Sequence, residues 1–198
     1  MTTITAGITT SLDGYTTGPN DGPEAGLGEG GERLHSWVFG GPWSYDEPAR
    51  GEPTGVDKEY LDEMTGRAGA VIGGRGTYEA AGAWGGKNPW PVRFFILTHR
   101  PQVEPAEGTF SFVDGLDEAV ARAREAASDK DIMVMGGADV IRQALGVGLV
   151  DELTITIAPV VLGAGKRLFE GFDESLNLEH VRVRQSPLAT HITYRVVR

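Results

Sequence analysis

The stretch Ile132-Met133-Val134-Met135-Gly136-Gly137-Ala138-Asp139-Val140-Ile141 decides the fold of this chain. It begins as a short apolar run typical of a buried strand, stops at two glycines and continues with a helical pattern. Glycine has no Cβ, so a ligand can lie against the main chain, and the free N–H groups of the helix start point at an anion. The stretch therefore indicates a phosphate or nucleotide site, although a strand-to-helix turn also needs glycine for steric reasons alone.

A second glycine-rich strand exit lies upstream, at Ala70-Val71-Ile72-Gly73-Gly74-Arg75-Gly76-Thr77. Arg75 would give a charge-assisted contact to a phosphate, and Thr77 places a hydroxyl near the start of the following helix. The alternative is that Arg75 is a solvated turn residue and Thr77 a local cap. Two such exits in one chain favour a nucleotide site over a purely structural role for either.

The strongest predicted strand, over 92–98, is rich in aromatic and branched residues and ends at Thr98-His99-Arg100. Open α/β sheets bind their ligands beyond the carboxyl ends of the strands. His99 and Arg100 could together hold the additional ribose phosphate that distinguishes NADPH from NADH. The alternative is an exposed basic strand end.

The composition of the chain excludes several kinds of partner and functional site. With 198 residues, 40% of them hydrophobic, the chain is expected to form one domain over 1–198. Its formal net charge of −10 argues against nucleic acid as the partner, because phosphate backbones need a basic surface. The absence of cysteine excludes disulfides, thiolate nucleophiles and cysteine-bound zinc, and no metal site is expected. The sequence has no signal peptide and no membrane span, so we expect a cytoplasmic protein.

Strands alternate with helices along most of the chain. The sequence pattern predicts helices over 32–39, 56–67, 77–83, 116–127 and 138–145. It predicts strands over 3–10, 68–72, 92–98, 109–113, 132–135, 152–158, 176–185 and 190–197, the last two as an antiparallel pair. Segments 16–31 and 40–55 are expected to be long loops. This order predicts an α/β sandwich with a mostly parallel sheet and an antiparallel edge.

Three segments in this order and at these spacings resemble the dihydrofolate reductase superfamily: Val71-Ile72-Gly73-Gly74-Arg75-Gly76-Thr77-Tyr78-Glu79, Phe95-Ile96-Leu97-Thr98 and Met135-Gly136-Gly137-Ala138. Ser11-Leu12-Asp13-Gly14, together with segments 148–153 and 157–165, is similar to one branch, the reductase domain of the bacterial riboflavin deaminase-reductase. The resemblance covers nearly the whole chain apart from the two long loops. It implies a dihydrofolate-reductase-like three-layer α/β/α sandwich with an antiparallel C-terminal hairpin.

The resemblance further implies that NADPH binds across the carboxyl ends of the strands. The pyrophosphate would be held by Gly74, Arg75, Gly76 and Thr77. The adenosine ribose phosphate would be surrounded by Thr98, His99 and Arg100. The path of the nicotinamide and phosphates would be lined by Gly136, Gly137, Ala138, Asp139 and Val140. Relatives often have a cis peptide between the paired glycines, and a homodimer through the C-terminal strands is expected.

Two carboxylates are the candidate catalytic residues. Asp13 could accept hydrogen bonds from a pterin or an aminopyrimidine, and the alternative is a plain Asp-Gly turn. Asp57 and Glu59 lie on the helix that carries the acidic group of dihydrofolate reductases. Lys58 is closest to the matching position, so either acid could instead be an exposed helix residue or a cap.

The resemblance implies an NADPH-dependent oxidoreductase that transfers hydride to a small pyrimidine- or pterin-like molecule. The favoured activity resembles that of 5-amino-6-(5-phosphoribosylamino)uracil reductase in riboflavin biosynthesis. The alternatives are a dihydrofolate reductase and a non-catalytic NADP(H)-binding or sensing protein. Tyr78-Glu79-Ala80-Ala81-Gly82 replaces the Asp-Asp-Pro segment of the riboflavin enzymes. Because the sequence has no cysteine to bind zinc, we expect a reductase-like domain without the deaminase half. No side chain is an obvious general acid, so water is expected to supply the proton.

Overall fold

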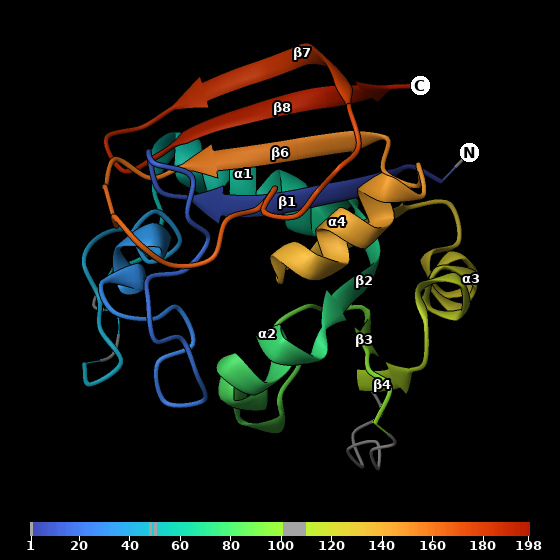
Figure 1. Cartoon of the computed structure of the whole chain (residues 1–198), viewed down its shortest axis with the longest axis horizontal. Coiled ribbons are helices and arrows are strands. Elements are labelled where there is room, and N and C mark those ends of the chain that lie inside the picture. Colours follow the sequence, from blue (N-terminus) through green and yellow to red (C-terminus); the bar gives the residue numbers. More distant parts are fainter. Residues whose placement is uncertain (1, 48, 50, 101–109) are drawn as a thin grey trace.

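The computed structural model describes residues 2–47, 49, 51–100 and 110–198. Eight strands form one sheet in the order β4-β3-β2-β5-β1-β6-β8-β7 (Figure 1). The strands are β1 (Ile4–Thr10), β2 (Ala68–Gly74), β3 (Arg93–Leu97), β4 (Phe110–Val113), β5 (Asp131–Met135), β6 (Glu152–Ile157), β7 (Asn177–Gln185) and β8 (Thr190–Val197). The first six pair in parallel, and β8 pairs antiparallel with both β6 and β7. The predicted mixed sheet is confirmed.

Helices cover both faces of the sheet. They are α1 (Gly55–Arg67), α2 (Arg75–Ala80), α3 (Leu116–Ala127) and α4 (Ala138–Gly146), with 3₁₀ turns η1 (Gly31–His35) and η2 (Gly82–Gly86). In Figure 1, α4 lies in front of the sheet and α1 behind it. Buried side chains of α3 and α4 share one core with β1, β2, β5 and β6, whereas Tyr78 of α2 packs in a separate core on the opposite face. Strand alternation explains this division, since Ala70 and Ile72 point to the first core and Val71 to the second.

Two predicted helices differ from the structure. The helix expected over 32–39 is only the short 3₁₀ turn η1. The helix expected over 77–83 begins earlier, at Arg75, and ends at Ala80. Gly82 and the next four residues break it, because Gly82, Ala83, Trp84, Gly85 and Gly86 all have positive φ angles, which a right-handed helix excludes.

The segment expected to be an exposed loop, 16–31, is folded on itself. The amide of Gly18 donates to the carbonyl of Leu27 at 2.7 Å, and the amide of Glu29 donates to that of Pro19 at 2.9 Å. Thr16 is buried, and both its amide and its hydroxyl donate hydrogen bonds to the carbonyl of Lys166. The loop is therefore an ordered cover beside the end of β1. No helix in the described part of the chain is long and apolar enough to span a bilayer.

Candidate active site

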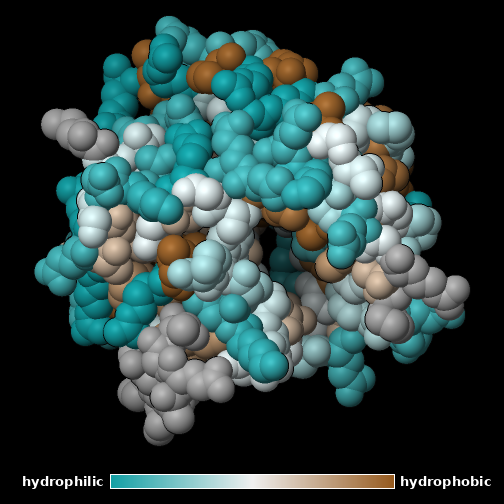
Figure 2. All heavy atoms as spheres, turned by 180° about the vertical axis from the view of Figure 1, so that it is seen from behind, coloured by the Kyte–Doolittle hydropathy of each residue, from teal (hydrophilic) through white to brown (hydrophobic). Residues whose placement is uncertain are grey.

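The three glycine-rich or polar segments singled out in the sequence emerge at one edge of the sheet. Strands β3, β2 and β5 are consecutive neighbours, and they run parallel. They end at Leu97, Gly74 and Met135, so the segments that follow them leave the sheet side by side. Figure 2 views the molecule from behind and shows a hollow near the centre of its back face. The sheet topology thus joins residues that lie more than 60 positions apart in the chain.

Arg75 links two of these segments directly. Its Nη1 donates to the hydroxyl of Thr98 at 3.3 Å, and its Nε donates to Glu79 at 2.7 Å. The Arg75 side chain is 24% exposed, so its guanidinium is held at the surface of the edge rather than free in solvent. A guanidinium held in this way is preorganised for a phosphate, because less conformational entropy is lost on binding.

The third segment packs on Thr77, at the start of α2. Gly136 and Gly137 have φ angles of +61° and +77°, which side chains other than glycine rarely adopt. A Cβ on Gly136 would lie 2.7 Å from Cγ2 of Thr77, and a Cβ on Gly137 would lie 3.1 Å from its Oγ1. The glycine pair is therefore required by conformation and by the close approach of Thr77. Among the described residues no peptide bond is cis, so the cis linkage expected from relatives is absent.

His99 and Arg100 lie at the outer end of this edge. The His99 ring is 90% exposed and contacts the Asp114 carboxylate at 2.5 Å. The amide of Arg100 donates to the hydroxyl of Thr98 at 3.1 Å, and its side chain is exposed. The structure thus places two basic side chains at the end of β3, with the Asp114 carboxylate beside one of them.

The other residues that were expected to bind the cofactor, from Gly76 and from the start of α4, differ in exposure and in contacts. Gly76 is exposed, and Ala138 is partly buried against the core. The Asp139 carboxylate is exposed and pairs with Arg142, which also donates to the carbonyl of Leu168 at 2.9 Å. Val140 is 4% exposed and packs against Gly74, so only its backbone faces the edge of the sheet.

Asp13 connects the turn after β1 to the 160–163 segment through hydrogen bonds. Its two carboxylate oxygens accept the amide protons of Leu162, at 3.1 Å, and Gly163, at 2.7 Å. A hydrogen bond with Ser11 and these amides lower the pKa of Asp13 to about 2, because they stabilise the charged form. Gly14 follows with a φ of +86°, as the Asp-Gly turn alternative requires. Asp13 thus holds the 160–163 segment in place, and a substrate contact would have to share its carboxylate with these amides.

Asp57 is not the exposed helix residue or cap that the sequence suggested. It is 4% exposed, and its Oδ1 accepts a hydrogen bond from Nε2 of His191 at 2.9 Å. The other ring nitrogen of His191, Nδ1, lies 2.9 Å from the hydroxyl of Thr156. Helix α1 lies over the sheet with this carboxylate facing β8, which the helix pattern alone could not specify.

Sequence reasoning missed His191 and Thr156. His191 is 1% exposed, and the rings of Trp37 and Tyr60 lie on it with centroids 4.9 Å and 4.3 Å away. Burial lowers the pKa of His191, and the Asp57 carboxylate opposes this change in part. A single histidine in a strand of alternating pattern carries no sign that it faces a carboxylate 134 residues away.

The Asp57–His191 pair lies at the same edge of the sheet as the three exit segments. Register pairs Gly7 of β1 with Met135, the last residue of β5, and pairs Thr9 with Thr156. Thr156 in turn is opposite His191 on β8. The Asp57–His191 pair therefore lies two residues beyond the end of β5, next to the exit that leads to Gly136.

The family model of the RibD C-terminal domain matches residues 2–192. The chain belongs to this family. A 55-residue match to the protein named YyaP of Bacillus subtilis is 47% identical, and it covers 28% of this chain and 29% of YyaP.

Solved structures resemble the whole chain. A putative riboflavin biosynthesis protein from Shewanella sp. PV-4 aligns over 99% of both chains, with a TM-score of 0.73 and 23% identity. A bifunctional deaminase and 5-amino-6-(5-phosphoribosylamino)uracil reductase from Thermotoga maritima has a TM-score of 0.63 and 15% identity; the alignment covers 99% of this chain and 57% of that protein. Dihydrofolate reductase from Enterococcus faecalis, solved with NADP(H), has a TM-score of 0.61 and 15% identity over 98% of this chain and 96% of that one. These likenesses confirm the dihydrofolate-reductase-like fold.

Proposed function

We propose that this RibD C-terminal domain protein is an NADPH-dependent reductase of a small pyrimidine-like molecule. The observation that carries the proposal is the convergence of Arg75, Thr98 and the Gly136–Gly137 turn at one edge of the sheet. Family membership and the NADP(H) in the Enterococcus faecalis structure support the choice of cofactor.

The residues present fit a phosphorylated dinucleotide. Within the described chain no side chain caps the amino end of α4, so the first amides of this nine-residue helix can meet a phosphate. Arg75 would add a charge-assisted contact to the pyrophosphate, and His99 and Arg100 would bind the ribose phosphate. Gly136 and Gly137 would let the dinucleotide lie against the backbone, because neither carries a Cβ.

When bound, NADPH supplies a hydride from its nicotinamide ring. The protein would orient the substrate next to that ring and keep water from the reacting atoms. Asp57 is the proposed polar anchor of the substrate. Its Oδ1 is bound to His191, and among the described residues no hydrogen bond to Oδ2 is found. A carboxylate oxygen of this kind can accept an N–H group of a pyrimidine or pterin ring. Asp13 would act on the substrate only by fixing the loop beside it.

The cofactor assignment is tested by calorimetric titration of NADPH and NADH into the wild-type protein and two variants. We expect NADPH to bind more tightly than NADH. Arg75→Ala should weaken both dinucleotides about tenfold or more, since a charged hydrogen bond contributes about 1.5–3 kcal/mol. His99→Ala with Arg100→Ala should remove the preference for NADPH. Arg124→Ala on α3 is the matched control, because it removes an exposed arginine far from this edge. An unchanged NADPH-to-NADH ratio in the double variant would count against the assignment.

Substrate class is tested by NADPH oxidation with 5-amino-6-(5-phosphoribosylamino)uracil and with dihydrofolate. Turnover of the first supports the riboflavin-type activity, and turnover of the second alone supports a dihydrofolate reductase. Tight NADPH binding without turnover of either would favour the non-catalytic sensor.

The expected homodimer is part of this proposal. Strand β7 is an edge strand of nine residues, at the top of the sheet in Figure 1. Leu178 and Val183 on it are 37% and 57% exposed, and its unpaired edge can pair with that of a second copy. Sedimentation of the wild type against Val183→Lys tests this arrangement. A wild type that sediments as a monomer would refute it.

A further inference from the structure

The sheet face beneath α1 carries a row of small and polar residues that crosses four strands. Gly7 of β1 is opposite Thr154 of β6. Thr193 of β8 is opposite both Thr154 and Arg182 of β7. Gly7 is the middle residue of its strand, a position where glycine weakens a sheet and often marks the close approach of a ligand. Among the described residues, a Cβ on Gly7 would come within 4 Å only of the Tyr60 hydroxyl, at 3.7 Å, so close packing does not require glycine there.

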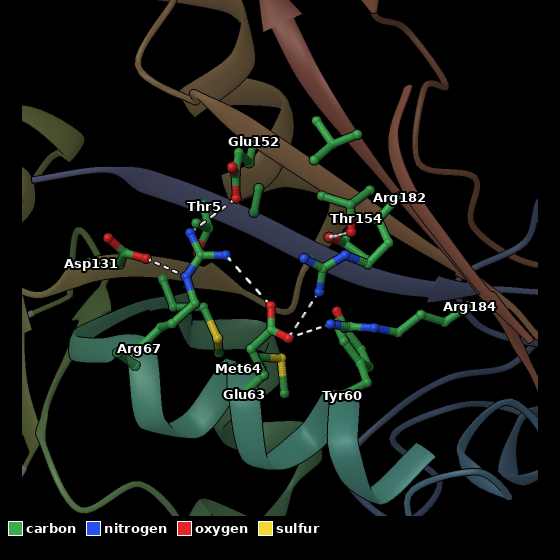
Figure 3. Close-up of a pocket in the computed structure, with 16 residues that line it drawn as sticks. Thr5, Tyr60, Glu63, Met64, Arg67, Asp131, Glu152, Thr154, Arg182 and Arg184 are labelled. Carbon is green, nitrogen blue, oxygen red and sulfur yellow. Dashed lines mark hydrogen bonds and ion pairs between the residues drawn. The ribbon is translucent and has the colours of Figure 1, made fainter. Parts of the chain in front are cut away.

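The space above this row is a cavity of about 110 Å³ (Figure 3). The row from Gly7 to Arg182 forms its floor, and Tyr60, Glu63 and Arg67 of α1 line it from the other side. Since a water molecule occupies about 30 Å³ of liquid, the cavity has room for an ion made of a few heavy atoms. The side chains of Glu63 and Arg182 are 38% and 54% exposed, so such an ion can enter from solvent.

The cavity extends towards the amino edge of the sheet, away from the three exit segments. Arg67, which lines it, is paired with Asp131 at 2.6 Å and with Glu152 at 3.0 Å. Asp131 and Glu152 are the first residues of β5 and β6, whereas the exit segments follow the last residues of their strands. The cavity is therefore separate from the edge where the dinucleotide is proposed to bind, and an inference about it does not depend on the proposed function.

Positive charge exceeds negative charge at the β7 end of the cavity. Arg182 and Arg184 are two positions apart on β7, and both donate to the same oxygen, Oε2 of Glu63, the first at 3.2 Å. Arg67 lies 4.0 Å from the other oxygen of Glu63, but it already has two acidic partners of its own. Two guanidinium groups of β7 thus share one carboxylate, in a chain whose formal net charge is −10.

Several hydrogen-bond donors at this end of the cavity are unused. A guanidinium has five N–H donors, and in the described part of the chain Arg182 and Arg184 each make one hydrogen bond, to Glu63. The Arg184 side chain is only 16% exposed, and a largely buried charged group needs further partners. The hydroxyls of Thr154 and Thr193 are 3.0 Å apart. A hydrogen bond between them uses one of their two protons, so the other can be donated to a ligand.

We propose that the cavity beneath α1 binds a small oxyanion of the size of phosphate. Arg182 and Arg184 would be its main partners, because guanidinium groups bind such ions through paired, charge-assisted N–H···O bonds. The free hydroxyl proton of the Thr154–Thr193 pair would add one donor, and the missing side chain at Gly7 would leave room for the ion. The ion would compete with Glu63 for the two arginines, so Glu63 should limit its affinity.

The first test locates the ion by ¹H–¹⁵N NMR. Inorganic phosphate is titrated into the wild-type protein at pH 7.5, with ionic strength held constant by sodium chloride. We expect saturable shifts of the amides of Gly7, Arg182 and Thr193. Phosphate could also bind at the proposed dinucleotide site, but the amides of Thr77 and Ala138 would report that event separately. Shifts confined to these two amides, or no saturable shift at the cavity, would overturn the proposal.

The second test changes the charges around the cavity. Arg182→Ala, at an exposed side chain, should weaken phosphate binding at the cavity about tenfold or more, since it removes a charged hydrogen bond. Glu63→Gln removes the competing charge and should tighten binding about three- to tenfold. Glu59→Gln, exposed on the same helix, changes the net charge equally and is the matched control. A gain in Glu63→Gln no larger than that in Glu59→Gln would overturn the proposed competition and, with it, the site.

The third test fills the cavity without changing a charge. Gly7→Val places a side chain on its floor and should abolish the saturable shifts of Arg182 and Thr193, while urea denaturation reports whether the variant is folded. Phosphate affinity equal to that of the wild type in folded Gly7→Val would place the ion elsewhere and overturn the proposal. Should this variant not fold, the charge variants of the second test decide.

Discussion

The Asp57 carboxylate and the His191 imidazole form a buried hydrogen bond of 2.9 Å between the first turn of α1 and the second residue of β8. Both side chains are at most 5% exposed. Neither partner could remain buried alone, because a desolvated carboxylate or imidazole N–H without a partner is strongly unfavourable. The pair therefore ties the position of α1 to the C-terminal strand, and several expectations follow from it and from the neighbouring contacts.

Two substitutions of Asp57 distinguish the loss of its negative charge from the loss of its hydrogen bond to His191. Asp57→Ala should reduce the free energy of unfolding by about 2–4 kcal/mol, since it leaves the His191 N–H buried and unpaired. Asp57→Asn keeps an acceptor oxygen at the same place and should cost less. Both are measured by urea denaturation at pH 7.5. Equal losses for the two variants would show that the hydrogen bond to His191 is not the stabilising element.

Two histidines should make stability fall on acidification. Burial lowers the pKa of His35 to about 4, and it also lowers that of His191, so the unfolded chain takes up protons first as pH drops below about 6.5. The contribution of His35 to stability is complete above about pH 6.5 and declines towards pH 4, at up to about 1.4 kcal/mol per pH unit, and the contribution of His191 declines in the same direction. Urea unfolding at pH 7.5 and pH 5 should show a smaller loss in His35→Gln than in the wild type. His99→Gln, at a 90% exposed site, is the control.

Asp13 should control the order of the 160–163 segment. Its lowered pKa, about 2, means that the carboxylate stays charged and holds the amides of Leu162 and Gly163 down to about pH 3. In Asp13→Ala these two amides should exchange with solvent at least tenfold faster, whereas amides of β6 stay unchanged. In Asp13→Asn the exchange rates of these two amides should lie between those of the wild type and of Asp13→Ala, because an amide oxygen accepts a weaker hydrogen bond than a carboxylate does. Hydrogen exchange by NMR measures all three, and unaltered protection in the alanine variant would contradict this role.

The contact between Gly136 and Thr77 should appear as energetic coupling. Gly136→Ala combines a φ of +61° with a Cβ 2.7 Å from Cγ2 of Thr77, so we expect a loss of about 1–3 kcal/mol in stability. Thr77→Ser removes that methyl group and should recover part of the loss in the double variant. A double-mutant cycle in urea measures the recovery. Strict additivity would mean that backbone strain alone causes the loss.

Asp114 should weaken the preference for NADPH. Its carboxylate is 2.5 Å from His99, so it would lie beside the ribose phosphate that His99 and Arg100 are proposed to bind. Asp114→Asn removes one negative charge there and should raise the affinity for NADPH about three- to tenfold, with NADH unchanged. Asp117→Asn in the first turn of α3 is the matched control. An equal gain for both dinucleotides would place the phosphate elsewhere.

The sequence by itself determined the order of strands and helices, because apolar periodicity and glycine breaks are local properties. Local sequence predicted four features in this way: the exits at Gly74 and at Gly136–Gly137, the polar end of β3 and the C-terminal hairpin. The ends of helices were harder to predict from the sequence. The expected helix over 77–83 stops early because residues from Gly82 to Gly86 have positive φ angles, and no local sequence pattern predicts such angles for Ala83 and Trp84.

Only the tertiary structure decided which polar side chains are buried together. The helix pattern could not distinguish Asp57 from Glu59 as the inward acid, and nothing near His191 in the sequence marks it as its partner. Burial, register and helix placement depend on residues far apart in the chain, such as Thr9, Thr156 and His191, which lie in one row across the sheet. Hydrogen bonds between such residues form only when the sheet is assembled, so the local sequence carries no record of them.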